Sequence, residues 1–479
     1  MRLPSPTIYL EAKMTQSPRR PSRPLRRTTL PRELQHVNLN AAGVDIGAEA
    51  HFAAVPAGRD PQGRDVRQFG AFTADLSALA DWLTACRIQT VAMESTGVYW
   101  IPLFQVLEAR GFEVKLVNPR HVKNVPGRKT DVLDCQWLQQ LHTYGLLQAS
   151  FRPEDQICVL RSYLRQREML ARYASHHIQH MQKALEQMNL KLHHVVSDIT
   201  GVTGMRILRA ILAGERDPYR LAQFRDHRCK NDEATIALAL QGDWRPEHLF
   251  ALRQALELFD FYRQQIAACD THIEDYLSTF QDRRAGQPLD KPTHRRSRQK
   301  NQPAFDVRSH LFRTSGVDLT AIQGIDAQTA LKLIAEIGLD MSRWPSDKHF
   351  ASWLALAPGS NISGGKRLSG RTKPYPNRPA AALRLAAYGL QNSHSALGAF
   401  LRRKKAHLGA PKAITATAHK LARLVYTMLK NGSQYVELGQ EECERRYRDR
   451  LICNLKRKAR ALGYDLLPRD APYPPSAPQ

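Results

Sequence analysis

The sequence predicts an α/β domain, then a long helical coiled-coil region, then a mostly α-helical C-terminal domain. Three observations support this fold class. Strand and helix signals alternate through residues 38–150, as in a layered α/β domain. Apolar residues recur at steps of three and four within residues 151–280, which is typical of long paired helices. Glycine-containing turns separate the short helical patterns of residues 314–432.

The α/β prediction rests on segments of opposite periodicity. Strands are expected at AAGVDIG (41–47), TVAMES (90–95) and FEVKLVN (112–118), with HFAAVPA (51–57) as a partner strand. Helices are expected at FTADLSALADWLTAC (72–86), VYWIPLFQVLEARG (98–111) and TDVLDCQWLQQLHTYG (130–145). The last two close on glycine, the usual residue after a helix end. This order predicts a sheet between two layers of helices.

The middle region contains two long helical patterns. Residues 155–195 carry apolar side chains at 174, 178, 181, 185, 188 and 192, and residues from about 245 to 280 carry a second series of nearly the same spacing. Such seams join helices of one chain or of two chains. An antiparallel hairpin, a dimerising coiled coil and an intramolecular bundle all remain open.

Three basic segments flank or separate these regions. Residues 1–37 are rich in Arg, Pro and Ser and predict a disordered arm, with Met14 as an alternative start. Residues 281–313 show no periodicity and predict a linker, an insertion or a nucleic-acid-binding loop. Residues 433–479 form a basic tail that ends in APYPPSAPQ.

The charge balance indicates a polyanionic partner. The 479 residues include 70 Lys plus Arg against 45 Asp plus Glu, a formal net charge of +25. Nucleic acid is the most economical partner, and an anionic membrane surface is the alternative. No long apolar run and no secretory signal are found, so we expect no membrane span. Seven scattered cysteines without a C-x-x-C pair fit a cytoplasmic protein.

Four acidic residues have the placement that a metal-dependent nuclease needs. Asp45 lies in one predicted strand and Glu94 closes another, where a buried charge is costly to desolvate. Asp131 and Asp134 are three residues apart at a helix start and share one face. Hard oxygen ligands of this kind predict a Mg²⁺ (or Mn²⁺) site acting on a phosphodiester. An ion-paired edge-strand aspartate and a helix cap with ordinary N-terminal acids are the alternatives.

A basic loop leads into the helix that carries the two aspartates. Arg120, Lys123, Arg128 and Lys129 all lie in NPRHVKNVPGRKTD (118–131). Such side chains would dock the scissile DNA backbone next to the metal. The alternative is a solvated loop.

A Gly/Ser/Lys loop, expected within residues 351–375, is the second candidate site. In NISGGKRLSG (361–370), Ser363 precedes two glycines and the pair Lys366 and Arg367. Glycines let a backbone approach phosphate closely, cations would stabilise a phosphorane, and a serine so placed could form a phosphoserine link. Ser360 and Ser369 are alternative nucleophiles, and an ordinary surface loop is the plain alternative.

A helix-hairpin-helix-like element is expected in GVDLTAIQGIDAQTALKLIAEIGLD (316–340). Its turn at Gly324 enters a helix that ends in another glycine. Turn amides and the helix N-terminus could hold a DNA phosphate, and simple helix packing is the alternative.

The histidine pairs carry no prediction of a metal site. His176 and His177, and then His193 and His194, are expected as surface or seam residues of the long helix, because metal-ligand spacing is missing.

Two stretches resemble one insertion-sequence transposase family, called one-hundred-ten, with its eleven-eleven subgroup. GVDIGAEAHFAAV, followed by the stretch from MESTGVYW to HTYGLLQ, resembles its N-terminal DEDD domain. LTAIQGIDAQTALKLIAEIG together with LALAPGSNISGGKRLSG resembles its C-terminal transposase domain. The resemblance covers about residues 40–150 and 315–430. The motif order is specific, although GVDIG by itself is not.

The resemblance implies a RuvC-like, RNase H-type first domain in a bacterial, nucleoid-associated enzyme. Asp45, Glu94, Asp131 and Asp134 match the family's four acids, and Ser363 is matched to its catalytic serine. Members are similar to recombinases guided by a structured RNA that pairs with donor and target DNA. A dimer that assembles into a tetrameric synapse is implied, with acids from one subunit and serine from another.

The chain also departs from the family pattern. Its basic arm, its 281–310 segment and its long tail make it longer than usual. After the serine, TKPYPNRPAAALR (372–384) stands where many relatives have a Lys-Gly-Asn-type step.

Three rival functions are open at this point. GVDIG also resembles a phosphate-loop strand of sugar kinases and actin-like ATPases, but no second Gly-rich loop follows it. A RuvC-like junction nuclease would use the same acids hydrolytically and need no serine. A non-catalytic nucleic-acid-binding protein would keep the acids as structural residues.

Overall fold

The computed structural model describes residues 38–119, 130–284, 286–291, 300–359, 361–372, 377–433, 435 and 439–466. The chain divides into two compact units, residues 1–152 and residues 153–479. The predicted arm at 1–37 lies outside the described residues, as does the end of the tail. Within the described residues, we find no helix with the length and apolar character that a membrane span requires.

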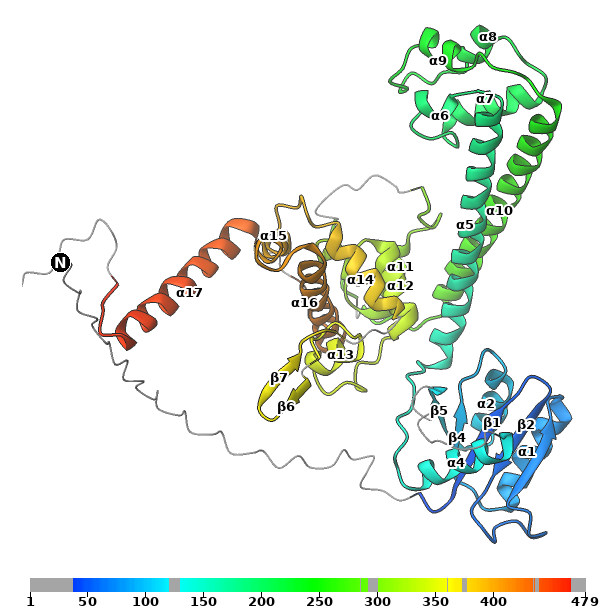
Figure 1. Cartoon of the computed structure of the whole chain (residues 1–479), viewed down its shortest axis with the longest axis vertical. Helices are drawn as coiled ribbons and strands as arrows, with labels where there is room; N and C mark the ends of the chain where they lie inside the picture. Colours follow the sequence, from blue (N-terminus) through cyan, green and yellow to red (C-terminus); the bar gives the residue numbers. More distant parts are fainter. Residues whose placement is uncertain are drawn as a thin grey trace, which may run out of the picture. The chain divides into compact units, whose positions relative to one another are not determined.

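The first unit is a mixed sheet of five strands in the order β3-β2-β1-β4-β5 (Figure 1). β1 pairs antiparallel with β2 and parallel with β4, while β2–β3 is antiparallel and β4–β5 is parallel. The strands are β1 (Ala41–Ile46), β2 (Ala50–Ala54), β3 (Val66–Gly70), β4 (Thr90–Glu94) and β5 (Glu113–Val117). The helices are α1 (Thr73–Ala85), α2 (Trp100–Ala109) and α4 (Asp131–Thr143).

Alternation of side chains along β1 separates two layers. Val44 and Ile46 pack into the larger core, which α1 and α2 complete. On the other face, Ala92 of β4 packs against Leu138 of α4. The predicted three-layer arrangement is therefore confirmed, and the mixed sheet is consistent with a RuvC-like fold.

One strand of this sheet, β3, was not predicted. Its residues VRQFG are half-buried or exposed at the edge of the sheet, so they lack the apolar run that marks the other strands. Edge strands with polar side chains are weak sequence signals.

In the second unit, two long helices form an antiparallel pair (Figure 1). They are α5 (Asp155–Gln187) and α10 (Pro246–Ser278). Tyr276 Oη donates a hydrogen bond to the Gln156 carbonyl at a distance of 3.1 Å, near one end of the pair. Further along, the buried side chains of Arg167 and Asp270 form an ion pair. Of the arrangements left open by the sequence, the structure shows the hairpin within one chain.

The first of these helices is shorter than expected. The apolar series predicted one helix over 155–195, but α5 ends at Gln187. Asn189 has a left-handed backbone (φ 56°), which an α-helix does not accommodate. The apolar series continues past this point because Leu192 is fully buried in the core of the next segment.

A small helical cap, which the sequence did not predict, connects the two long helices at their far end (Figure 1). It consists of α6 (Leu192–Val195), α7 (Val202–Leu212), α8 (Pro218–Ala222) and α9 (Glu233–Ala239). These helices share one apolar core with the distal halves of α5 and α10.

The remaining part is mostly helical, as expected. Its elements are α11 (Val307–Ser315), η2 (Leu319–Ala321), α12 (Ala327–Ile337), α13 (Asp347–Trp353), β6 (Asn361–Ser363), β7 (Lys366–Ser369), α14 (Arg378–Tyr388), α15 (Ala396–Leu408), α16 (Ala410–Asn431) and α17 (Gly439–Ala461). Arg161 of α5 donates hydrogen bonds to the carbonyl groups of Ala335 and Glu336 and so joins α12 to the long helix pair.

The structure shows regular elements within three segments of this part. The segment expected as a Gly/Ser/Lys loop contains the β6–β7 hairpin, because its two central glycines allow a tight turn. The basic tail contains α17, which packs on α15 through contacts such as Arg402 to Gln440. The expected linker, 281–313, includes most of α11, whose N-cap is Asp306.

Candidate functional site

The sheet places Asp45 and Glu94 next to each other. Val44 of β1 pairs with Met93 of β4 in a parallel register, and both side chains enter the larger core. One residue further on, Asp45 and Glu94 therefore stand side by side on the opposite face, at the carboxyl ends of their strands. That face is the one that α4 covers.

A glycine in β1 lets α4 lie directly on the strand. A Cβ atom at position 43 would overlap the Gln139 amide nitrogen and the Cys135 carbonyl oxygen of α4. Glycine at this position permits the close approach because it has no Cβ atom. The sequence analysis did not single out Gly43, although its place two residues before Asp45 on the same strand face is a usable signal.

The first turn of α4 supplies the other two acids. Thr130 is the N-cap residue, and its hydroxyl accepts a hydrogen bond from the Leu133 amide at 3.2 Å. Asp131 and Asp134 follow in the first turn, where the helix dipole favours negative charge. Asp131 is exposed and Asp134 is half-buried.

The four acids act on one another electrostatically. Burial, followed by the charges of Glu94, Asp134 and Asp131, raises the pKa of Asp45 from 3.8 to about 6. Each of the three charges disfavours ionisation of Asp45, so all three lie close enough to affect it. The structure thus brings together the four acids that the sequence analysis selected.

The donor set suits a hard divalent cation. All four side chains offer carboxylate oxygens, the ligands that Mg²⁺ and Mn²⁺ take in proteins. No three of these side chains bring their carboxylate oxygens within 4.8 Å of one another. Among the described residues, only Glu186, His193 and His194 bring three possible ligand atoms that close. Like charges repel, and a cation between the carboxylates would draw them inward.

A cysteine lies beneath the acids. Cys135 follows Asp134 in α4, is fully buried and has its thiol against the Val132 carbonyl at 3.1 Å. Burial and the charge of Asp45 raise the pKa of this thiol to about 12. In the metal-free protein the thiol is therefore protonated at physiological pH.

Apolar side chains border the acidic group, and the sequence analysis missed them. Val98 and Tyr99 follow β4, and Val132 and Leu133 stand between the two aspartates of α4; all four are exposed. Apolar residues in the exposed first turn of a helix are an unusual pattern, which was available in the sequence.

The basic loop before α4 falls outside the described residues, so Arg120, Lys123, Arg128 and Lys129 have no described positions. Ser360 and the Arg367 side chain are likewise outside the description.

Ser363 ends β6 and is paired in register with Lys366, the first residue of β7. Gly364 (φ 54°) and Gly365 (φ 74°) form the turn between them, in the left-handed conformations of a type I′ turn. Ser363 and Lys366 are both exposed, and no described residue forms a hydrogen bond or ion pair with either side chain. The alternative nucleophile Ser369 accepts a hydrogen bond from the Arg371 amide at 3.3 Å.

Gly324 takes part in helix packing. Its backbone is left-handed (φ 92°), and a Cβ atom there would lie 2.9 Å from the Ala386 carbonyl oxygen and 3.0 Å from Leu390 Cγ. The helix that follows, α12, is capped by Asp326, which accepts a hydrogen bond from the Thr329 amide. These contacts account for the glycine without a phosphate, so DNA binding at Gly324 stays a prediction.

Two family models relate this chain to DNA transposases. A family model described as "Transposase", for the DEDD type, matches residues 42–190, and it covers the sheet, the four acids and α5. A second model, "Transposase IS116/IS110/IS902 family", matches residues 318–395 and covers the serine hairpin. The two matches, in this order along the chain, support an insertion-sequence transposase of this family. No curated protein matches the chain.

Proposed function

We propose that this transposase cuts and rejoins DNA with two sets of groups, a divalent cation held by four acids and a serine nucleophile. Asp45, Glu94, Asp131 and Asp134 would hold Mg²⁺ or Mn²⁺, and Ser363 would attack the phosphodiester. The raised pKa of Asp45 is the observation that carries the proposal, because three further carboxylates crowd it at the ends of two adjacent strands. A structural aspartate would instead be paired with a basic side chain.

The acids do their work by position and charge. Bound in this site, the cation would polarise the scissile phosphate and offset its negative charge. Asp45 is held by β1 and Glu94 by β4, while α4 presents Asp131 and Asp134 from its first turn. Ligands on rigid elements keep their geometry better than ligands on loops.

The serine hairpin supplies the covalent step. The Ser363 Oγ–phosphorus bond would form as the bond from phosphorus to the leaving DNA oxygen breaks, and the serine proton would pass to solvent. The leaving strand would end in a hydroxyl group. Attack by another strand's hydroxyl on the phosphoserine would release Ser363 and reseal the DNA. Gly364 and Gly365 leave room for the backbone, and Lys366 beside Ser363 would offset phosphate charge.

DNA at the element ends and at the target is the proposed substrate, with a structured guide RNA as the second nucleic-acid partner. The net charge of +25 supports binding to both. We also propose a dimer that assembles into a tetramer, in which acids of one subunit act with the serine of another. The α5–α10 pair is a candidate coiled coil for that assembly, and the turn at Gly324 a candidate helix-hairpin-helix contact with DNA.

A covalent adduct tests the proposal most directly. The full chain would be mixed with Mg²⁺, the RNA flanking the element and DNA carrying the element ends, and then resolved on a denaturing gel. We expect a protein–DNA adduct that Ser363→Ala abolishes, that the matched control Ser369→Ala retains, and that EDTA prevents.

The other outcomes select the rivals. Cleavage without an adduct, unchanged in Ser363→Ala, would establish a hydrolytic RuvC-like nuclease and reject the serine. An adduct lost only in Ser369→Ala would move the nucleophile to that residue. Binding without cleavage under every condition would support a non-catalytic nucleic-acid-binding protein.

A further inference from the structure

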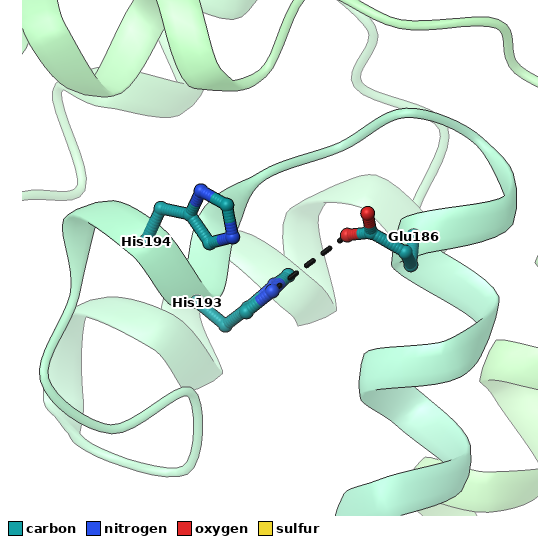
Figure 2. Close-up of side chains that lie close together, drawn as sticks. All are labelled: Glu186, His193 and His194. Carbon is teal, nitrogen blue, oxygen red and sulfur yellow. Dashed lines mark ion pairs between the residues drawn. The ribbon is translucent and has the colours of Figure 1, made fainter.

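A carboxylate and two imidazoles meet at the far end of the long helix pair. Figure 2 shows the ring of His193 pointing at Glu186, with the ring of His194 beside it. Glu186 lies in the last turn of α5, and both histidines belong to α6. The sequence analysis placed these histidines on one continuous helix; the end of α5 at Gln187 instead folds them back beside Glu186.

The three side chains have the separation of an open ligand set. One ligand atom from each lies within 4.8 Å of the other two. His193 Nε2 is 3.6 Å from a Glu186 carboxylate oxygen, and the two imidazole centroids are 4.4 Å apart. Ligand atoms around tetrahedral Zn²⁺, at about 2.0–2.2 Å from the metal, are separated by roughly 3.4 Å. Small side-chain rotations therefore suffice to complete the site.

The backbone that carries these residues is held by its own contacts. The left-handed Asn189 turns the chain, and the buried Leu190 donates its amide hydrogen to the Leu185 carbonyl at 2.9 Å. The Lys191 amide donates to the Ala239 carbonyl of α9 at 2.7 Å. The ligand set is thus fixed by buried packing on both sides of the turn.

The orientation of His193 leaves one nitrogen for a ligand bond. Its Nδ1 atom is buried and has no hydrogen-bond partner among the described residues. Nε2 is the nitrogen that faces Glu186. A neutral imidazole with its proton on Nδ1 would offer the Nε2 lone pair to a metal.

Lys191 would compete with a metal ion for the Glu186 carboxylate. Its ammonium group forms an ion pair with the Glu186 carboxylate. A divalent cation would displace this exposed monovalent partner. The competition gives a test that separates a metal site from a simple charge cluster.

We propose that Glu186, His193 and His194 bind a borderline divalent cation, with Zn²⁺ as the best fit, and that the ion clamps α6 to the end of α5. Two nitrogens and one oxygen favour Zn²⁺ over Mg²⁺. The site is separate in chemistry from the four-acid site, which offers oxygen alone. It would stiffen the cap of the helix pair and take no part in phosphodiester chemistry.

Cobalt titration of the full chain tests this site. Co²⁺ stands in for Zn²⁺ and reports nitrogen coordination through its visible absorption band, with excess Mg²⁺ present to occupy the four-acid site. We expect one equivalent of Co²⁺, displaced by Zn²⁺, with affinity reduced at least about tenfold in His193→Ala and in His194→Gln. His227→Ala, an exposed histidine of the same cap, should titrate like the native chain.

A second variant strengthens the test. Lys191→Met removes the competing ammonium and should tighten Co²⁺ binding several-fold, whereas a metal held elsewhere would not respond. The proposal is overturned if His193→Ala and His194→Gln, each shown to be folded by circular dichroism, bind one equivalent of Co²⁺ with the affinity of the native chain, or if the native chain binds no Co²⁺ in the presence of excess Mg²⁺.

Discussion

The four-acid site and the serine hairpin are built in different ways within one chain. Asp45 and Glu94 extend from buried strands, and α4 is pressed onto them through Gly43. Ser363 stands in a two-stranded hairpin whose turn is fully exposed. The first site stores electrostatic repulsion in a rigid frame, while the second has no described neighbour that activates its hydroxyl. The comparison teaches that the fold already groups the four acids around Asp45, whereas the proposed role of Ser363 depends on what contacts the hairpin.

The largest expected effect is on cleavage. Asp45→Asn keeps the shape of the side chain but removes the charge that would hold the cation. We expect cleavage of element-end DNA to fall roughly a thousandfold or more, because a catalytic metal supplies several kcal/mol. DNA binding should change little. Glu113→Gln, an exposed acid of β5, is the matched control for a cleavage assay with parallel filter binding.

If Asp45→Asn lost DNA binding to the same degree as cleavage, Asp45 would have a structural role. The contrast between the four-acid site and the hairpin would then no longer hold.

The next effect tests the rigid frame. Gly43→Ala should destabilise the first unit by roughly 1–3 kcal/mol or more, because a methyl group overlaps the backbone of α4. Thermal unfolding would measure it, and Mg²⁺ affinity should fall with it as Asp131 and Asp134 shift. Gly389→Ala, where a Cβ has 3.5 Å to its nearest neighbour, is the control. A native melting curve for Gly43→Ala would show that α4 is not pressed onto β1.

A smaller effect is expected at the hairpin. Alanine at both Gly364 and Gly365 would be strained by about 1–2 kcal/mol per residue in the left-handed conformation. Adduct formation should fall while the Mg²⁺ affinity of the four-acid site stays native, because nothing lies within 4 Å of a Cβ atom at either glycine. The single variant Gly364→Asn should instead retain adduct formation, since Asn-Gly is a favoured sequence for a type I′ turn. Loss of Mg²⁺ binding in the alanine variant would show that the hairpin affects the four-acid site, which we treat as independent of it.

The smallest effect concerns metal-free stability. The folded pKa of Asp45, about 6, lies above its ordinary value of 3.8, so the folded state binds the proton more tightly. Stability contributed by this group is present below about pH 4 and is lost as pH rises towards about 6. At neutral pH, Asp45→Asn should therefore stabilise the metal-free protein, by roughly 1–2 kcal/mol after allowance for solvent screening.

Urea unfolding at several pH values would measure this gain. It should grow between about pH 4 and 6 and then level off; a gain that is constant with pH would show that Asp45 is not crowded by charge.

Much of the first unit was readable from the sequence because its strands are buried. Apolar runs located β1, β2, β4 and β5, and the glycines after α2 and α4 located the helix ends. The acids stood out because a charge next to such a run is costly unless it has a use. The strand β3 escaped because its side chains are half-buried at an edge, where residue type is weakly constrained.

The second unit was harder to predict because its decisive features are not periodic. The seam residues at 188 and 192 are buried, as expected of a continuing helix, but they pack into the cap across the break at Asn189. The meeting of Glu186 with His193 and His194 follows from that break and has no signature in residue spacing. The paired glycines indicated the hairpin around Ser363, although the sequence analysis described this segment only as a Gly/Ser/Lys loop.

The buried thiol under the acidic group has a consequence for durability. An accessible cysteine beside the four acids would be open to oxidation and to binding by soft metals such as copper or cadmium. Cys135 is fully buried on the inner face of α4, and burial together with the charge of Asp45 raises its pKa to about 12, so the thiol is neither accessible nor ionised. Oxidants that modify the exposed Cys453 should therefore leave Cys135 unmodified in the folded protein.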